Sequence, residues 1–136
     1  MATTAEAEAA TPRTPFYLLG GHDTVQAIVN RFYDLMESDP AYAELRAMHA
    51  PDLSPMRKSL TGFLSAWAGG PRDWFTDNPG KCMMSMHKPF VISDAVAGQW
   101  GAAMKRAIAD VAPENASLAA EMGTVLEQMA SGMANA

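Results

Sequence analysis

The sequence predicts an all-α fold, and three observations support that prediction. Apolar residues recur at the 3.6-residue period of amphipathic helices in several separate stretches. No stretch carries a convincing strand or hairpin signal, and glycine and proline punctuate the chain where the helical periods end. With 136 residues and a hydrophobic fraction of 49%, the chain has the size and composition of one domain with a packed core.

The first main helix is expected between the segments GGHDT and ESDP. Asp23 or Thr24 can cap its start, and Pro40 follows its end. Upstream, residues 1–15 lack the cationic region and apolar run of a signal peptide. We interpret them as a flexible tail that precedes a single domain of residues 16–136. The apolar stripe of the helix comprises Val25, Ile28, Val29, Phe32, Tyr33 and Met36.

A short helical turn over residues 42–48 leads into the second main helix. Ser54 is expected as its N-cap, with Pro55 at the first helical position. The Gly-Gly-Pro sequence at residues 69–71 ends this helix. Its apolar face comprises Met56, Leu60, Phe63, Leu64 and Trp67.

Two further helices are expected in the C-terminal part. Ser93 is expected to cap the first of them, with Asp94 near its positive end. Pro113 and Glu114 open the second. The stripes comprise Val96, Trp100, Met104, Ala107, Ile108 and Val111 in the first, and Leu118, Met122, Val125, Leu126, Met129 and Met133 in the second.

Residues 72–92 lie between the helix pairs and read as irregular. A short helix near residues 83–87 would have to end ahead of Pro89, because the residue before a proline disfavours helical backbone. Compact helical domains usually have short connections, so a long ordered excursion is typically functional. Alternatively, it is held in place by a group that is not protein. A large flat cofactor would account for both properties.

Composition and charge exclude several classes of function. The formal net charge is −5 and no basic cluster is present, which argues against nucleic acid or an anionic membrane as a partner. No apolar run is long enough for a transmembrane helix. Cys82 is the only cysteine, so no internal disulfide can form, and we expect a cytoplasmic, reducing location.

The chain has three histidines, and they carry the possible metal chemistry. His22 precedes the first main helix and is expected to be an exposed or capping residue. His49 and His87 lie between helices, and neither belongs to a zinc-binding motif. Pairing Cys82 with a histidine could make a nucleophile, but no orienting acid stands at a recognisable position.

His87 lies in the apolar segment KCMMSMHKPF. Met83, Met84 and Met86 surround it, whereas Met104, Met122 and Met129 are expected to fill gaps in a helical core. A neutral imidazole can ligate iron through one nitrogen, and apolar neighbours would exclude water from the metal. On the local residues alone, both a ligand role and an ordinary loop role for His87 stay open.

Four spaced motifs resemble the truncated haemoglobins. These are RFYDLM, FLSAWAGGP, MHKPFVIS and AVAGQW, and the resemblance covers roughly residues 16–133. In that family a proximal histidine follows the Gly-Gly-Pro by sixteen residues, and His87 has this spacing from Pro71. Trp100, thirteen residues after His87, is the feature that resembles group II.

The resemblance implies a two-over-two helical sandwich around haem b, with His87 as the only proximal protein ligand. It also implies a distal, ligand-binding side with Tyr33, Trp100 and His49 as polar groups. Met56 and Leu60 occupy neighbouring distal positions but are poor donors. Neutral His49 could donate or accept a hydrogen bond there, whereas protonated His49 could only donate.

The remaining expected haem contacts follow from the same resemblance. Members commonly carry arginines just before the proximal histidine, but here Met84 and Met86 stand there. The haem propionates would then meet Arg57, Lys58, Lys81 or Lys88, or stay in water. The expected apolar contacts are Phe32, Leu53, Met56, Leu60, Phe63, Trp74, Met83, Met86, Phe90 and Met129.

The function implied by the resemblance is reversible binding of O₂ at ferrous iron. CO, NO, peroxide and anions are further expected ligands, and an unidentified reductase is an expected partner of a monomer or homodimer. NO dioxygenase-like or peroxidase-like side activity stays open. Two alternatives remain: a haem peroxidase-like enzyme in which His49 handles protons, and a haem-free helical interaction module on a globin scaffold.

Overall fold

The computed structural model describes residues 14–80, 87 and 90–135. Within these residues every regular element is helical, which confirms the all-α prediction. None of the helices there is long and apolar enough to cross a lipid bilayer. The elements are α2 (Pro15–Leu19), α3 (His22–Ser38), the 3-10 helix η1 (Pro40–Tyr42), α4 (Ala43–Ala47), α5 (Ser54–Trp67), α6 (Asp73–Asp77), α8 (Asp94–Val111) and α9 (Ala116–Gly132).

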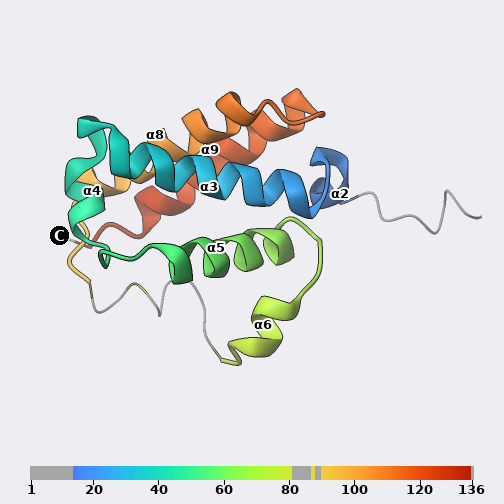
Figure 1. The fold of residues 1–136 in the computed structure, drawn as a ribbon, viewed down its shortest axis with the longest axis horizontal. Coiled ribbons are helices and arrows are strands. Elements are labelled where there is room, and N and C mark those ends of the chain that lie inside the picture. The colour runs from blue at the N-terminus through green and yellow to red at the C-terminus, as the bar shows by residue number, and fades with distance from the viewer. Residues whose placement is uncertain (1–13, 81–86, 88–89, 136) are drawn as a thin grey trace, which may run out of the picture.

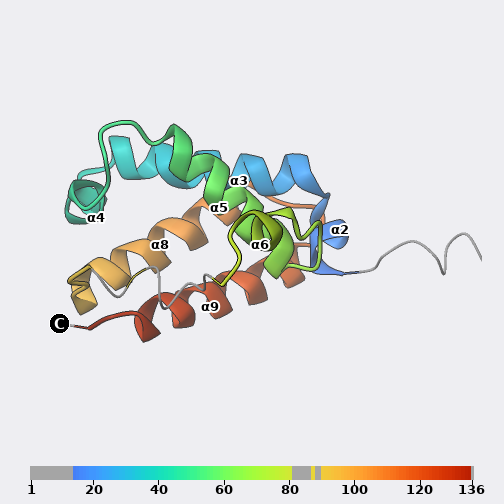
Figure 2. The ribbon, with the colours of Figure 1, turned by 90° about the horizontal axis from the view of Figure 1, so that it is seen from below.

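The longest described helices form two pairs. Figures 1 and 2 show α3 and α5 on one side of the molecule and α8 and α9 on the other. The core lies where α3 packs on α8. Val29 and Phe32 of α3, and Ala103 and Met104 of α8, have no exposed surface. Alanines on α8 let the two backbones approach closely, so the large side chains of α3 fill the space between the pairs.

The start of α3 differs from the sequence prediction. Gly21, at a φ of 79°, is the N-cap, and no side chain caps the helix. Asp23 lies inside the first turn, so the capping role predicted for Asp23 or Thr24 is wrong. The reason is the unpredicted helix α2, which ends at Leu19. Gly20 and Gly21, both with positive φ, connect it to α3. Glycine adopts that backbone without strain.

The start of α5 is determined by residues next to it in sequence, and its end also packs against α2. Leu53 is the N-cap and Ser54 is the first helical residue, so Ser54 is not the cap. The Ser54 N–H donates instead to the Asp52 carboxylate at 3.0 Å. At the other end the Gly-Gly-Pro stop is confirmed. A Cβ on Gly70 would lie 2.5 Å from the ring of Phe16, so this glycine lets α2 pack against the end of α5.

The C-terminal helices follow the prediction with two corrections. Ser93 caps α8 as predicted, because its hydroxyl accepts from the Val96 N–H at 3.1 Å. Helix α9 begins at Ala116 and not at Pro113, because the Asn115 side chain caps it. Val125, expected on the buried face of α9, is 44% exposed.

The segment of residues 72–92 is less irregular than the sequence predicts. It contains α6, which buries Trp74 against Phe63 of α5 with 5.3 Å between ring centroids. The short helix expected near residues 83–87 lies outside the described residues except for His87, which is helical. The expected tail of residues 1–15 also lies outside them, except for Thr14 and for Pro15, which opens α2.

Candidate functional site

Tyr33 of α3 is the most enclosed polar aromatic residue of the site. It is 2% exposed and its ring meets Phe32 edge-on, with 4.9 Å between centroids. Burial raises the pKa of Tyr33 to about 12, and the nearby Arg57 guanidinium lowers it to a smaller extent. Tyr33 therefore keeps its proton at neutral pH and can donate a hydrogen bond.

Trp100 of α8 also contacts Phe32. The two rings meet at 5.3 Å with an interplanar angle of 61°, and Trp100 is half-buried. Phe32, which is fully buried, therefore links Tyr33 and Trp100 across the two helix pairs.

The hydroxyl of Tyr33 and the indole N–H of Trp100 share one further property. Within residues 14–80, 87 and 90–135 neither group has a protein hydrogen-bond partner. Neither polar atom is sealed from solvent either, because this part of the chain has no fully buried side-chain N or O atom without a partner. Because both donors stay open to solvent and have no protein acceptor, they are available to water or a ligand.

His49 approaches the same site from the loop after α4. Its ring lies 6.1 Å from the Tyr33 ring, at 77°. Its Nδ1 lies 2.8 Å from the Leu45 carbonyl oxygen, and a carbonyl can only accept, so Nδ1 carries the proton of the neutral ring. The free Nε2 is then an acceptor in neutral His49. This corrects the expectation that neutral His49 could donate to a ligand; only the protonated ring can.

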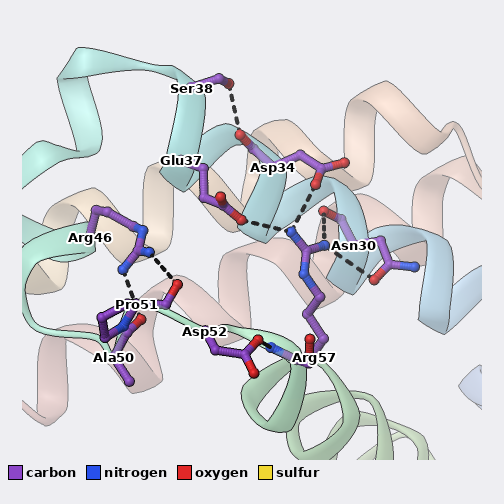
Figure 3. Close-up of polar contacts among 10 residues, drawn as sticks. Asn30, Asp34, Glu37, Ser38, Arg46, Ala50, Pro51, Asp52 and Arg57 are labelled. Atoms are coloured by element: carbon purple, nitrogen blue, oxygen red, sulfur yellow. Dashed lines mark hydrogen bonds and ion pairs between the residues drawn. The ribbon is translucent and has the colours of Figure 1, made fainter.

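Two residues that the sequence did not single out hold the His49 loop. Arg46 donates to the carbonyls of Ala50 and Pro51, both at 3.0 Å, as Figure 3 shows. The Gln99 side chain on α8 accepts from the Leu45 N–H at 3.1 Å. An arginine in the last turn of a short helix has many uses, so no sequence signal distinguished this one.

Helix α5 supplies an apolar wall. Leu53, Leu60 and Phe63 are buried, and Trp74 donates from Nε1 to the Ser59 hydroxyl at 3.1 Å. Met56, by contrast, is 40% exposed, although it was expected on the apolar face.

The two basic residues expected at the propionates differ in their surroundings. Lys58 is exposed. The Arg57 guanidinium points to α3, where it donates to Asp34 at 2.9 Å and to Glu37 at 3.1 Å (Figure 3). These two carboxylates already neutralise it, and the propionate role expected for Arg57 stays a prediction.

The opposite, proximal side is described only in part. His87 is half-buried, and its carbonyl accepts from the Phe90 N–H at 3.0 Å. Asn135, after α9, fixes the next residues: its side chain accepts from the Ile92 N–H at 2.7 Å and donates to the Phe90 carbonyl at 2.8 Å. The sequence analysis missed Asn135. The expected residues Lys81, Cys82, Met83, Met84, Met86 and Lys88 lie outside the described residues.

These side chains fit a large, flat, apolar group. Phe90 is 50% exposed and Met56 is 40% exposed, so each leaves apolar surface that protein does not cover. Met129 of α9, a further expected contact, is partly buried against the core. No cluster of three or more His, Cys, Asp or Glu side chains occurs in the described part of the chain, and a macrocycle that supplies most ligands to its metal needs none.

Comparison with known proteins gives a consistent result. The bacterial-like globin family matches residues 14–135. A cold-adapted truncated haemoglobin from Pseudoalteromonas haloplanktis superimposes with a TM-score of 0.86 at 32% identity, over 91% of this chain and 99% of that one. A Group II 2-on-2 haemoglobin from Agrobacterium tumefaciens gives a TM-score of 0.87 at 29% identity, over 93% and 98%.

One curated relative carries a different group label. A Group 1 truncated haemoglobin from Chlamydomonas moewusii is 33% identical over 93 residues, which are 66% of this chain. The match spans about half of that relative, 51% of its length. The structural neighbours confirm the truncated globin fold expected from the sequence, whereas the relatives carry both group labels.

Proposed function

This chain belongs to the bacterial-like globin family, which implies a haem cofactor, and on that premise we propose that it reversibly binds O₂ through haem b. Ferrous haem iron supplies the binding chemistry for O₂, CO and NO. The chain would supply a histidine nitrogen to hold the haem, an apolar wall from α5 and hydrogen-bond donors. The observation that carries the proposal is the pair of unused donors, Tyr33 and Trp100, whose rings both contact Phe32.

His87 is the proposed proximal ligand. Two observations support this role: its motif position in the sequence, and the two hydrogen bonds by which the Asn135 side chain holds Phe90 and Ile92 just after it. A fixed backbone orients an imidazole and keeps its nitrogen aligned with a metal.

Tyr33 and Trp100 are the proposed distal donors, with His49 as a third polar group. Both side chains would slow the escape of a ligand that carries partial negative charge, such as O₂, because they are hydrogen-bond donors, and they would act less on CO, which carries less charge. Neutral His49 offers only an acceptor at Nε2, and that acceptor suits the Tyr33 hydroxyl or a water molecule. Trp100 also supports membership of group II.

Further parts of the proposal rest on this binding role. The domain of residues 16–136 acts in the cytoplasm as a monomer or homodimer and is re-reduced by a reductase. Lys58 and Lys88 are the proposed propionate partners, since Arg57 is occupied on α3. Anions and peroxide are proposed as additional ligands of the ferric form.

A second candidate function is peroxidase-like turnover. One observation favours it: hydrogen bonding of Nδ1 to Leu45 leaves Nε2 of neutral His49 free to take a proton from a peroxide. Turnover with peroxide by the haem-loaded protein, compared with free haemin, tests this candidate. Loss of the activity in His49→Phe would support it.

The main proposal is tested by the absorption spectrum of the purified protein and of His87→Gly. We expect a haem Soret band in the wild type, a bleached band in the variant, and partial recovery on adding imidazole. His22→Gly is the control, because His22 is exposed on α3. A wild type without a Soret band would favour the haem-free module, and a variant with unchanged haem affinity would overturn the ligand role of His87.

A further inference from the structure

Arg57 makes a four-acceptor connection between α5 and α3. Its Nη1 donates to the Asn30 carbonyl at 3.0 Å and lies 3.3 Å from the Asn30 side-chain oxygen. Its Nη2 donates to Asp34 at 2.9 Å and to Glu37 at 3.1 Å. These acceptors are spaced by four and three residues, so they lie on one face of α3, as Figure 3 shows.

Within residues 14–80, both ion pairs that link α3 to α5 run through Arg57. The acids are largely exposed, at 57% for Asp34 and 48% for Glu37, whereas the Arg57 side chain is 24% exposed. Exposed ion pairs contribute little to stability. A guanidinium that satisfies several acceptors at once does, however, fix the distance and rotation between two helices.

The same guanidinium also reaches Tyr33. Its Cζ lies 5.6 Å from the centre of the Tyr33 ring, within the range of a cation–π contact. A cation over a phenol ring favours the phenolate, which makes the O–H more acidic and a stronger donor. The nearby Arg57 charge lowers the pKa of Tyr33 against the larger effect of burial, which is consistent with this contact.

We propose that Arg57 is a positioning residue for the distal site, which locks α5 to the carboxylate face of α3 and holds and polarises the Tyr33 phenol. This inference rests on the proposed ligand-binding function. It assigns to Arg57 a role at the ligand through Tyr33, in place of a role at the propionates. It also explains why one cation serves three residues of α3 that otherwise face solvent.

The test compares Arg57→Met with Arg31→Met in the haem-loaded protein. Arg31 is the matched control, because it lies on α3 and pairs with Asp110 of α8 at 2.8 Å but makes no contact with Tyr33. We expect O₂ dissociation to accelerate about three- to fivefold in Arg57→Met, the scale of one cation–π contact. CO dissociation and the control variant should change little. Arg57→Lys should restore part of the slow O₂ dissociation, because lysine keeps the positive charge but lacks the two guanidinium nitrogens that bond α3.

A double-mutant cycle separates positioning from general stability. In a Tyr33→Phe background the Arg57→Met effect on O₂ dissociation should disappear, since the donor through which Arg57 acts is gone. The C–O stretching frequency of the CO adduct, a readout independent of turnover, should shift in Arg57→Met and stay constant when Tyr33 is absent. An undiminished Arg57 effect in the Tyr33→Phe background would overturn the inference. Equal acceleration of O₂ and CO would do the same, whereas a wild type that binds no O₂ would refute the proposed function itself.

Discussion

Replacing Trp100 by phenylalanine separates its two contributions to the distal site. The indole is half-buried and contacts Phe32 edge-on at 5.3 Å. A phenylalanine at this position retains a ring for that contact but has no N–H. Because no protein acceptor in the described residues uses the Trp100 N–H, removing it leaves no protein group unpaired.

The magnitude follows from the lost hydrogen bond. A hydrogen bond to a charged group contributes about 1.5–3 kcal/mol. Since about 1.4 kcal/mol corresponds to a tenfold change, O₂ should dissociate about one to two decades faster from Trp100→Phe. The smaller side chain also opens space, but that change affects every ligand alike.

The assay is stopped-flow measurement of O₂ and CO dissociation from the ferrous protein. The donor model predicts a large change for O₂ and a small one for CO, because CO carries less charge. Trp67→Phe is the control, since Trp67 is likewise partly buried but lies at the end of α5. Equal acceleration of both gases in Trp100→Phe would refute the donor role and make the indole a steric gate.

Three further predictions concern the distal site, alkaline pH and the proximal side. His49→Phe keeps a ring beside Tyr33 but removes the Nε2 acceptor, so the O₂ dissociation rate should change while the CO rate changes little. Equal O₂ rates in the variant and the wild type would place His49 away from the ligand. Because burial raises the pKa of Tyr33 from 10.0 to about 12, the unfolded state should lose this proton first as pH rises. Stability should therefore fall by about 3 kcal/mol between about pH 10 and 12, and denaturant titrations of Tyr33→Phe should lack that loss. Finally, Asn135→Ala removes both side-chain hydrogen bonds to residues 90 and 92. It should therefore lower the free energy of unfolding by about 1–3 kcal/mol and speed haem loss. Unchanged haem retention would show that Asn135 does not hold the proximal segment.

The sequence by itself determined the four main helices, α3, α5, α8 and α9, and the aromatic residues of the site. Apolar residues recur at a 3.6-residue period in α3, α5 and α8. At this spacing they fall on one face of each helix, and that face is buried in the core. Phe32 and Tyr33 are consecutive, and both are buried because α3 is covered by other helices on more than one side. The Gly-Gly-Pro stop and the Ser93 cap are local rules, since they depend on residues within a few positions of each other.

The tertiary structure alone decided the polar geometry. Whether Arg57 meets α3 or a propionate depends on which helix lies beside α5, and its acids stand 20 and 23 positions earlier in the chain. The tautomer of His49 was equally invisible in sequence, because it depends on whether the ring folds back onto the Leu45 carbonyl. Asn135 gives the clearest case, because its side chain bonds backbone groups 43 and 45 residues away. Every residue has such backbone groups, so the sequence does not show which of them Asn135 will bond. A sequence predicts which residues are buried, whereas hydrogen bonds between distant segments exist only once packing has brought those segments together.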